Sequence, residues 1–115
     1  MRGDSDDWVS LVAKSILTAI VTDAAEREFS GPFTLDDFLR AWIEHDSALI
    51  GVLPEPPGRK TRSATQARTY WFYEGCHELE ETGRIAEVSD GKFVVASLST
   101  LVSHARDARD ARVER

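Results

Sequence analysis

The sequence predicts a mainly helical α+β domain, and three observations in its second half carry most of that prediction. Ser63 can cap a helix, and helix-permissive residues follow it as far as Glu81. Gly83 fits the position just past a helix end, where a left-handed backbone costs glycine little. Residues 84–88 then alternate polar and apolar, and residues 92–96 are rich in β-branched and aromatic side chains. We therefore expect a helix, a stop and a two-stranded hairpin.

The expected helix at 63–82 has two distinct faces. Gln66 lies three residues after Ser63, which is the spacing of a capping box. At 100° per residue, Phe72, Cys76 and Leu79 fall on one stripe, which we expect to face the core. The opposite face is expected to carry Ser63, Gln66, Ala67, Tyr70 and Glu74.

A long helix is expected near the N-terminus, because apolar residues there recur at helical spacing. They cover a wide surface, which usually means burial against more than one neighbour. Residues 30–32, Ser-Gly-Pro, break the chain after this helix. The residues that define the apolar stripe are Trp8, Leu11, Val12, Ile16, Ala19 and Ile20.

A second helix is expected at 35–45, with Thr34 and Asp37 at the spacing of another capping box. Residues 46–52 either extend that helix or form a separate turn. The proline-rich run 53–58 cannot lie inside a helix. A last helix is expected to begin at Ser97 or Ser99 and to carry a narrow apolar stripe.

Residues 79–85, followed by a glycine-containing hairpin, resemble the end of the recognition helix and the wing of bacterial winged helix-turn-helix regulators. The resemblance covers roughly residues 33–97, and the expected strand at Phe33 belongs to it. It implies a three-helix core, a β-hairpin wing and an extra C-terminal helix. The domains would be residues 1–97, a winged helix with a long N-terminal helix, and 98–115, a dimerisation helix or tail. The linker before Ser63 is longer than the tight turn of a simple helix-turn-helix.

Charge is unevenly distributed along this acidic chain, whose formal net charge is −6. The only dense basic cluster lies in residues 59–72, which hold no acidic residue. It lies at the front of the expected recognition helix, where cations would help docking on phosphates. Glu74 counts against close docking along the whole helix. The candidate DNA-binding residues are Arg59, Lys60, Arg62, Ser63, Gln66, Arg68, Tyr70 and Lys92.

Each of these candidates also has a structural interpretation. The cluster can be a solvated loop beside a proline turn, and Lys92 can be an exposed charge after the hairpin turn. Cys76 is best explained as a buried small apolar side chain. The three histidines, His45, His77 and His104, show no metal-ligand spacing. No phosphate loop or nucleophile elbow occurs, so we expect no enzyme, cofactor or metal site.

Bulk composition favours a cytoplasmic protein. No stretch reaches the roughly 18 consecutive apolar residues that span a membrane, and residues 1–7 lack a signal-peptide pattern. The lone Cys76 excludes an internal disulfide.

Three hypotheses of function follow. The first is a transcriptional regulator that binds duplex DNA, either sequence-specifically or generally, and dimerises through its N- and C-terminal helices. The second is a winged-helix module for protein interaction, such as a subunit or adaptor of a larger nucleic-acid-processing complex. The third is a fully helical partner-binding protein in which residues 84–96 form no hairpin.

Overall fold

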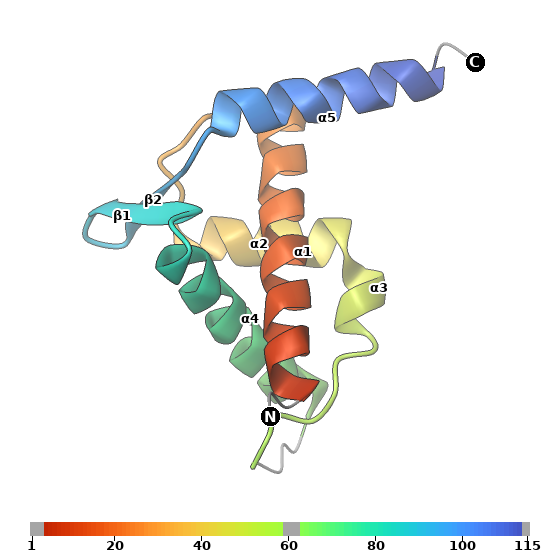
Figure 1. Cartoon of the computed structure of the whole chain (residues 1–115), viewed down its shortest axis with the longest axis vertical. Coiled ribbons are helices and arrows are strands. Elements are labelled where there is room, and N and C mark those ends of the chain that lie inside the picture. The colour runs from red at the N-terminus through yellow and green to blue at the C-terminus, as the bar shows by residue number, and fades with distance from the viewer. Residues whose placement is uncertain (1–3, 59–62, 114–115) are drawn as a thin grey trace.

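The computed structural model describes residues 4–58 and 63–113 of the chain (Figure 1). The described part is mainly helical, with one two-stranded antiparallel hairpin. Its elements, in order, are α1 (Asp4–Arg27), α2 (Leu35–His45), α3 (Ser47–Ile50), α4 (Ala64–Glu81), β1 (Ile85–Ser89), β2 (Lys92–Val95) and α5 (Leu98–Val113).

Helix α1 is the centre of the fold. Helix α2 packs across α1, α4 packs against it at an incline, and α5 crosses its C-terminal end (Figure 1). These neighbours explain the wide apolar surface predicted for this helix, since Val12, Ile16 and Ile20 are fully buried. Leu11 belongs to the predicted apolar surface of α1 but is 47% exposed, and it lines a groove together with residues of α3.

Against the expectation that no stretch is apolar enough to span a membrane, residues Asp7–Arg27 are long and apolar enough by length and composition alone. Half of the 18-residue segment that meets these criteria is buried inside the protein. The core helix of a soluble protein meets the same two criteria, so this test does not distinguish the two cases.

The hairpin lies directly after α4, as predicted. Ile85 pairs with Val95 and Ala86 with Val94, and a bulge follows Glu87. Gly91 occupies the tight reversal with a φ of 73°, which glycine adopts without strain. The hypothesis of a fully helical protein is therefore wrong.

Phe33 adds a single bridge to the hairpin. Its backbone N–H donates to the carbonyl of Phe93 at 2.8 Å, and the N–H of Phe93 donates back at 2.7 Å. The rings of Phe33 and Phe93 both flank Phe38 of α2, at centroid distances of 5.8 and 6.2 Å. The expected pairing of Phe33 with the hairpin is confirmed, as a single bridge and not as a strand, and it joins the hairpin to α2.

Helix α2 begins as predicted. The Thr34 hydroxyl accepts from the backbone N–H of Asp37, and the Asp37 carboxylate accepts from the N–H of Thr34, at 3.1 and 2.8 Å. Residues after α2 form a separate turn, α3, because the Asp46 side chain caps it and its backbone departs from the helical conformation. Trp42 of α2 is fully buried and stacks on Phe72 of α4.

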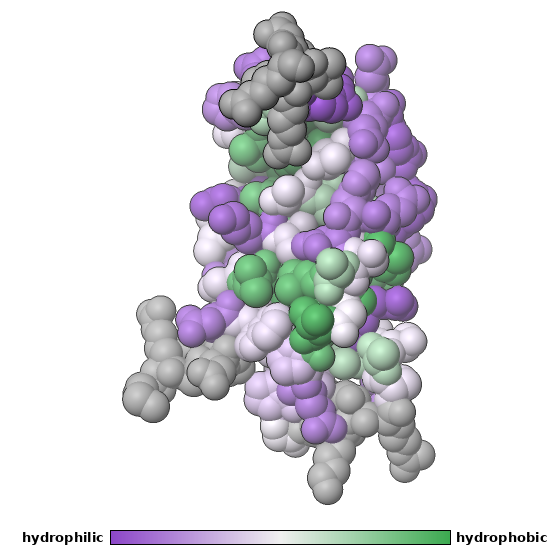
Figure 2. Space-filling view, turned by 90° about the vertical axis from the view of Figure 1, so that its right-hand side faces the viewer, coloured by the Kyte–Doolittle hydropathy of each residue, from purple (hydrophilic) through white to green (hydrophobic). Residues whose placement is uncertain are grey.

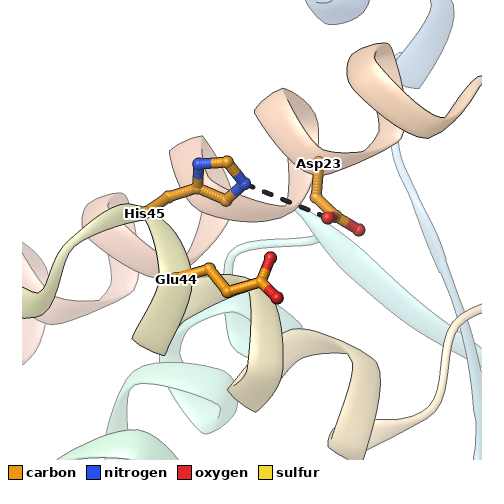
Figure 3. A group of neighbouring side chains, drawn as sticks. All are labelled: Asp23, Glu44 and His45. Carbon is orange, nitrogen blue, oxygen red and sulfur yellow. Dashed lines mark ion pairs between the residues drawn. The ribbon is translucent and has the colours of Figure 1, made fainter.

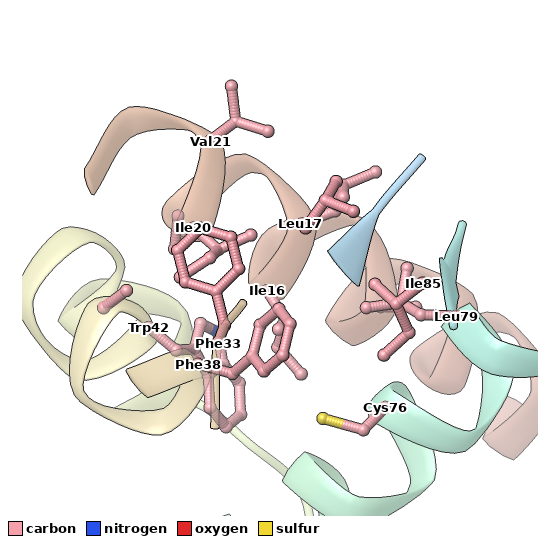
Figure 4. Packing of buried hydrophobic residues seen from close by; sticks show 14 of the residues in the cluster. Ile16, Leu17, Ile20, Val21, Phe33, Phe38, Trp42, Cys76, Leu79 and Ile85 are labelled. Carbon is pink, nitrogen blue, oxygen red and sulfur yellow. The ribbon is translucent and has the colours of Figure 1, made fainter. Parts of the chain in front are cut away.

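The core gathers side chains from α1, α2, α4 and the hairpin, as Figure 4 shows for Ile16, Phe33, Trp42 and Ile85. The first part of α5 also packs against it, through the stripe Leu98, Leu101, Val102 and Ala105. Arg106 then donates to the carbonyl of Ala25 at 3.2 Å. Residues 98–106 are therefore packed on α1 and are not a solvated tail.

Candidate nucleic-acid interface

The first turn of α4 is exposed. Ser63 is the N-cap, and its hydroxyl accepts from the backbone N–H of Gln66 at 3.3 Å. This is the first half of the predicted capping box. The turn contains no acidic residue, and its exposed positions are Ser63, Ala64, Thr65 and Gln66.

Two residues predicted on the outer face of α4 lie differently. Ala67 is 7% exposed, so its predicted outward position is wrong. Tyr70 is half-buried, its ring meets that of Trp71 edge-on at 5.1 Å, and its hydroxyl donates to Glu74 at 3.2 Å. The Trp71 indole in turn donates to the carbonyl of Pro54 at 2.8 Å. The proline-rich segment thus packs on this part of α4, which local helix periodicity could not reveal.

The basic cluster is described only in part. Arg59, Lys60 and Arg62 lie outside the described residues. Arg68 is half-buried, and its Nε atom is buried without a hydrogen-bond partner among the residues that the structure describes. A phosphate contact by Arg68 would therefore come from its terminal guanidinium nitrogens.

The second half of α4 is acidic. From Glu74 onward it carries no Lys or Arg, and His77 pairs with Glu81 at 3.0 Å on the surface. Because carboxylates repel phosphates, this half of the helix opposes close contact with DNA. The acidic residues are Glu74, Glu78, Glu80 and Glu81.

The hairpin presents mixed charge. Lys92 is exposed at the start of β2, as the sequence predicted. Glu87 accepts from the backbone N–H of Gly91 at 2.9 Å, so this carboxylate supports the turn. Asp90 is also exposed beside it. Lys92 can reach a phosphate only next to these two acids.

An apolar groove between α1 and α3 was missed at the sequence level. It has a volume of about 540 Å³, and its apolar wall includes the exposed side chains of Leu11 and Val52 together with Leu49. Figure 2 shows apolar atoms gathered on this side of the molecule. The sequence signal for this groove was the apolar surface of α1, which is wider than a single stripe. Apolar residues beyond those that the core covers stay exposed and can form such a groove.

A second group missed by sequence reasoning is a cluster of Asp23, Glu44 and His45, drawn in Figure 3. It joins the last turns of α1 to the end of α2. One ligand atom from each residue lies within 4.8 Å of the others. Only the packing of α1 on α2 brings the three together, and the spacing of histidines alone did not point to them.

Comparisons of this chain with protein-family models, curated proteins and solved structures find no match. The functional assignment therefore depends on the geometry of the chain itself.

Proposed function

We propose that this protein is a winged helix that binds duplex DNA through the N-terminal turn of α4, as a transcriptional regulator in the cytoplasm. The observation that carries the proposal is the exposed, acid-free first turn of α4. The order of elements supports it, because α1, the Phe33 bridge, α2, α4 and the hairpin follow one another as in a winged helix.

The charge along α4 limits how the helix can enter the major groove. Recognition helices contact base edges mainly with their N-terminal residues. Thr65, Gln66 and Thr69 supply neutral polar groups there, and all three are exposed. The acidic half from Glu74 onward would be held away from the phosphates. An end-on approach of α4 fits this distribution better than docking along its length.

The proposal is tested with the double substitution Thr65→Glu and Gln66→Glu. Acidic residues in the first turn favour a helix, and glutamate at position 66 keeps the capping-box pattern with Ser63, so folding should be preserved. The two carboxylates would face the phosphates. We expect affinity for random-sequence duplex DNA at low salt, measured by fluorescence anisotropy, to fall on the order of tenfold.

A matched control is Ser99→Glu with Thr100→Glu. These residues are exposed in the first turn of α5, so they add the same charge at equivalent helix positions. DNA affinity of the control should stay near that of the wild type. No binding of duplex DNA by the wild type at low salt, or equal losses in both double variants, would refute the proposal.

A second candidate function is binding of a protein, and the apolar groove between α1 and α3 favours it. Val52 is 65% exposed there. Val52→Asp should abolish recovery of a stoichiometric partner from the native host without changing DNA affinity. Recovery that is unaffected by Val52→Asp would exclude the groove as the binding surface.

A further inference from the structure

The side chains of Asp23, Glu44 and His45 converge where α1 meets the end of α2. Nε2 of His45 lies 3.9 Å from Oδ1 of Asp23 and 3.7 Å from Oε2 of Glu26. Figure 3 shows the imidazole turned toward Asp23, with the Glu44 carboxylate extended toward the same space. An imidazole nitrogen and carboxylate oxygens thus surround one small volume.

Asp23 is the buried member of this group, with a side chain only 7% exposed. Its Oδ2 accepts one long hydrogen bond, from Arg27 at 3.4 Å. Its Oδ1 faces Nε2 of His45 at 3.9 Å, which is too long for a direct hydrogen bond. A buried carboxylate is stabilised by a donor or by a cation. The space between Asp23 and His45 can therefore hold a cation that both side chains bind.

The charge of the group also favours a cation. Asp23, Glu26 and Glu44 are acidic, and Arg27 is the basic residue that contacts them. Arg27 is half-exposed and bonds only Oδ2, so it does not occupy the space between Asp23 and His45.

We propose that Asp23, Glu44 and His45 bind a divalent transition-metal ion, with Zn²⁺ as the best match to the donors. Zn²⁺ takes histidine nitrogen and carboxylate oxygen at about 2.0–2.2 Å, so tetrahedral ligand atoms stand about 3.4 Å apart. Nε2 of His45 lies 3.9 Å from Oδ1 of Asp23 and 3.7 Å from Oε2 of Glu26, so these separations need to close by only a few tenths of an ångström. The ligand atom of Glu44 lies within 4.8 Å of those of Asp23 and His45, so its side chain has to move by about 1.4 Å at most.

The two glutamates can provide this adjustment. Asp23 is held in the core, whereas Glu44 is exposed and the Glu26 side chain is 49% exposed. Glu26 lies one turn beyond Asp23 on α1, so it or a water molecule completes four-coordination. The ion would join the end of α2 to α1. The proposed metal ligands belong to α1 and α2, and the proposed DNA contact belongs to α4. Metal binding is therefore independent of DNA binding.

The test uses the tag-free, EDTA-dialysed protein with Co²⁺ and Zn²⁺ alone as probes. We expect one Co²⁺ per chain with the intense visible absorption of a four-coordinate site, displaced by Zn²⁺ in a calorimetric titration. His45→Ala and Glu44→Gln should each weaken Zn²⁺ binding by about tenfold or more. Loss of a residue that only orients a ligand already lowers metal affinity by about tenfold, and loss of a ligand should lower it at least as much.

His77→Ala is the matched control, because His77 also pairs with a glutamate but lies on the exposed face of α4. It should bind Zn²⁺ as the wild type does. Circular dichroism checks folding, and if His45→Ala unfolds, the exposed Glu44→Gln decides the result. No stoichiometric binding by the wild type, or equal affinity in Glu44→Gln and the wild type, would overturn the proposal.

Discussion

The indole N–H of Trp42 donates to the hydroxyl of Ser15 at 2.8 Å, and this bond is buried between α2 and α1. The Ser15 hydroxyl donates onward to Asp46, which caps α3. One serine thus links three helices and satisfies the polar atom of a fully buried tryptophan.

Ser15→Ala should therefore lower the free energy of unfolding by about 1–3 kcal/mol, because it leaves the Trp42 N–H unpaired inside the core. Urea denaturation followed by tryptophan fluorescence measures this loss. Ser10→Ala, at an exposed position of the same helix, should change stability by less than about 0.5 kcal/mol. Equal effects of the two substitutions would contradict a structural role for the hydrogen bond.

Gly75 allows α4 to approach α1 closely. A Cβ atom there would lie 2.8 Å from Cδ1 of Ile16, 2.9 Å from Cγ1 of Val12 and 3.3 Å from the backbone nitrogen of Ala13. Gly75→Ala gains about 1 kcal/mol of helix propensity, but overpacking costs about 1–3 kcal/mol. We expect a net loss of stability in thermal denaturation.

The control for Gly75→Ala is Gly51→Ala. A Cβ at Gly51 meets only ordinary contacts of 3.5 Å or more, and its φ of −68° suits alanine. This variant should be as stable as the wild type or slightly more stable. A stabilised Gly75→Ala protein would show that the two helices can separate at little cost.

Features set by local chemistry could be predicted from the sequence. The caps at Thr34 and Ser63, the stop at Gly83 and the turn at Gly91 each depend on a few neighbouring residues, and the structure has all of them. The hairpin and its bridge to Phe33 followed from the resemblance and the strand pattern.

Features set by tertiary packing could not be predicted. Ala67 is buried although it lies outside the apolar stripe of α4, in the part of the helix where Trp71 bonds the proline-rich segment. Leu11 is exposed although it lies on the apolar surface of α1. Asp23 and His45 meet only because α1 and α2 pack together. Periodicity identifies the apolar faces of a helix, but not the neighbours that cover them.

Asp37 gives the capping box a testable pH dependence. Burial raises its pKa, but hydrogen bonds from the backbone and side chain of Thr34, together with Arg40, outweigh burial and lower the pKa below 3.8. Its stabilisation is thus fully present above pH 3.8 and is lost as the pH falls through the folded-state pKa. Asp37→Asn should cost about 1 kcal/mol at neutral pH and nothing at the acid limit.

Asp36→Asn is the control for this prediction. Asp36 is the exposed neighbour of Asp37 in the same first turn and makes no capping hydrogen bond. Its substitution removes the same charge with a smaller effect at neutral pH. The comparison uses urea denaturation at several pH values. A constant difference between Asp37→Asn and the wild type down to the acid limit would contradict the lowered pKa.

Cys76 is predicted to be an inert thiol. Its side chain lies in the core at 4% exposure, and burial together with the nearby Glu80 carboxylate raises its pKa from 9.0 to about 12. Because only the thiolate reacts, a thiol-specific disulfide reagent should label native protein far more slowly than urea-unfolded protein at pH 8. The raised pKa stabilises the fold below pH 9, and this contribution should disappear as the pH rises from about 9 to 12. Native labelling as fast as unfolded labelling would show that the α4 face carrying Cys76 opens readily from α1.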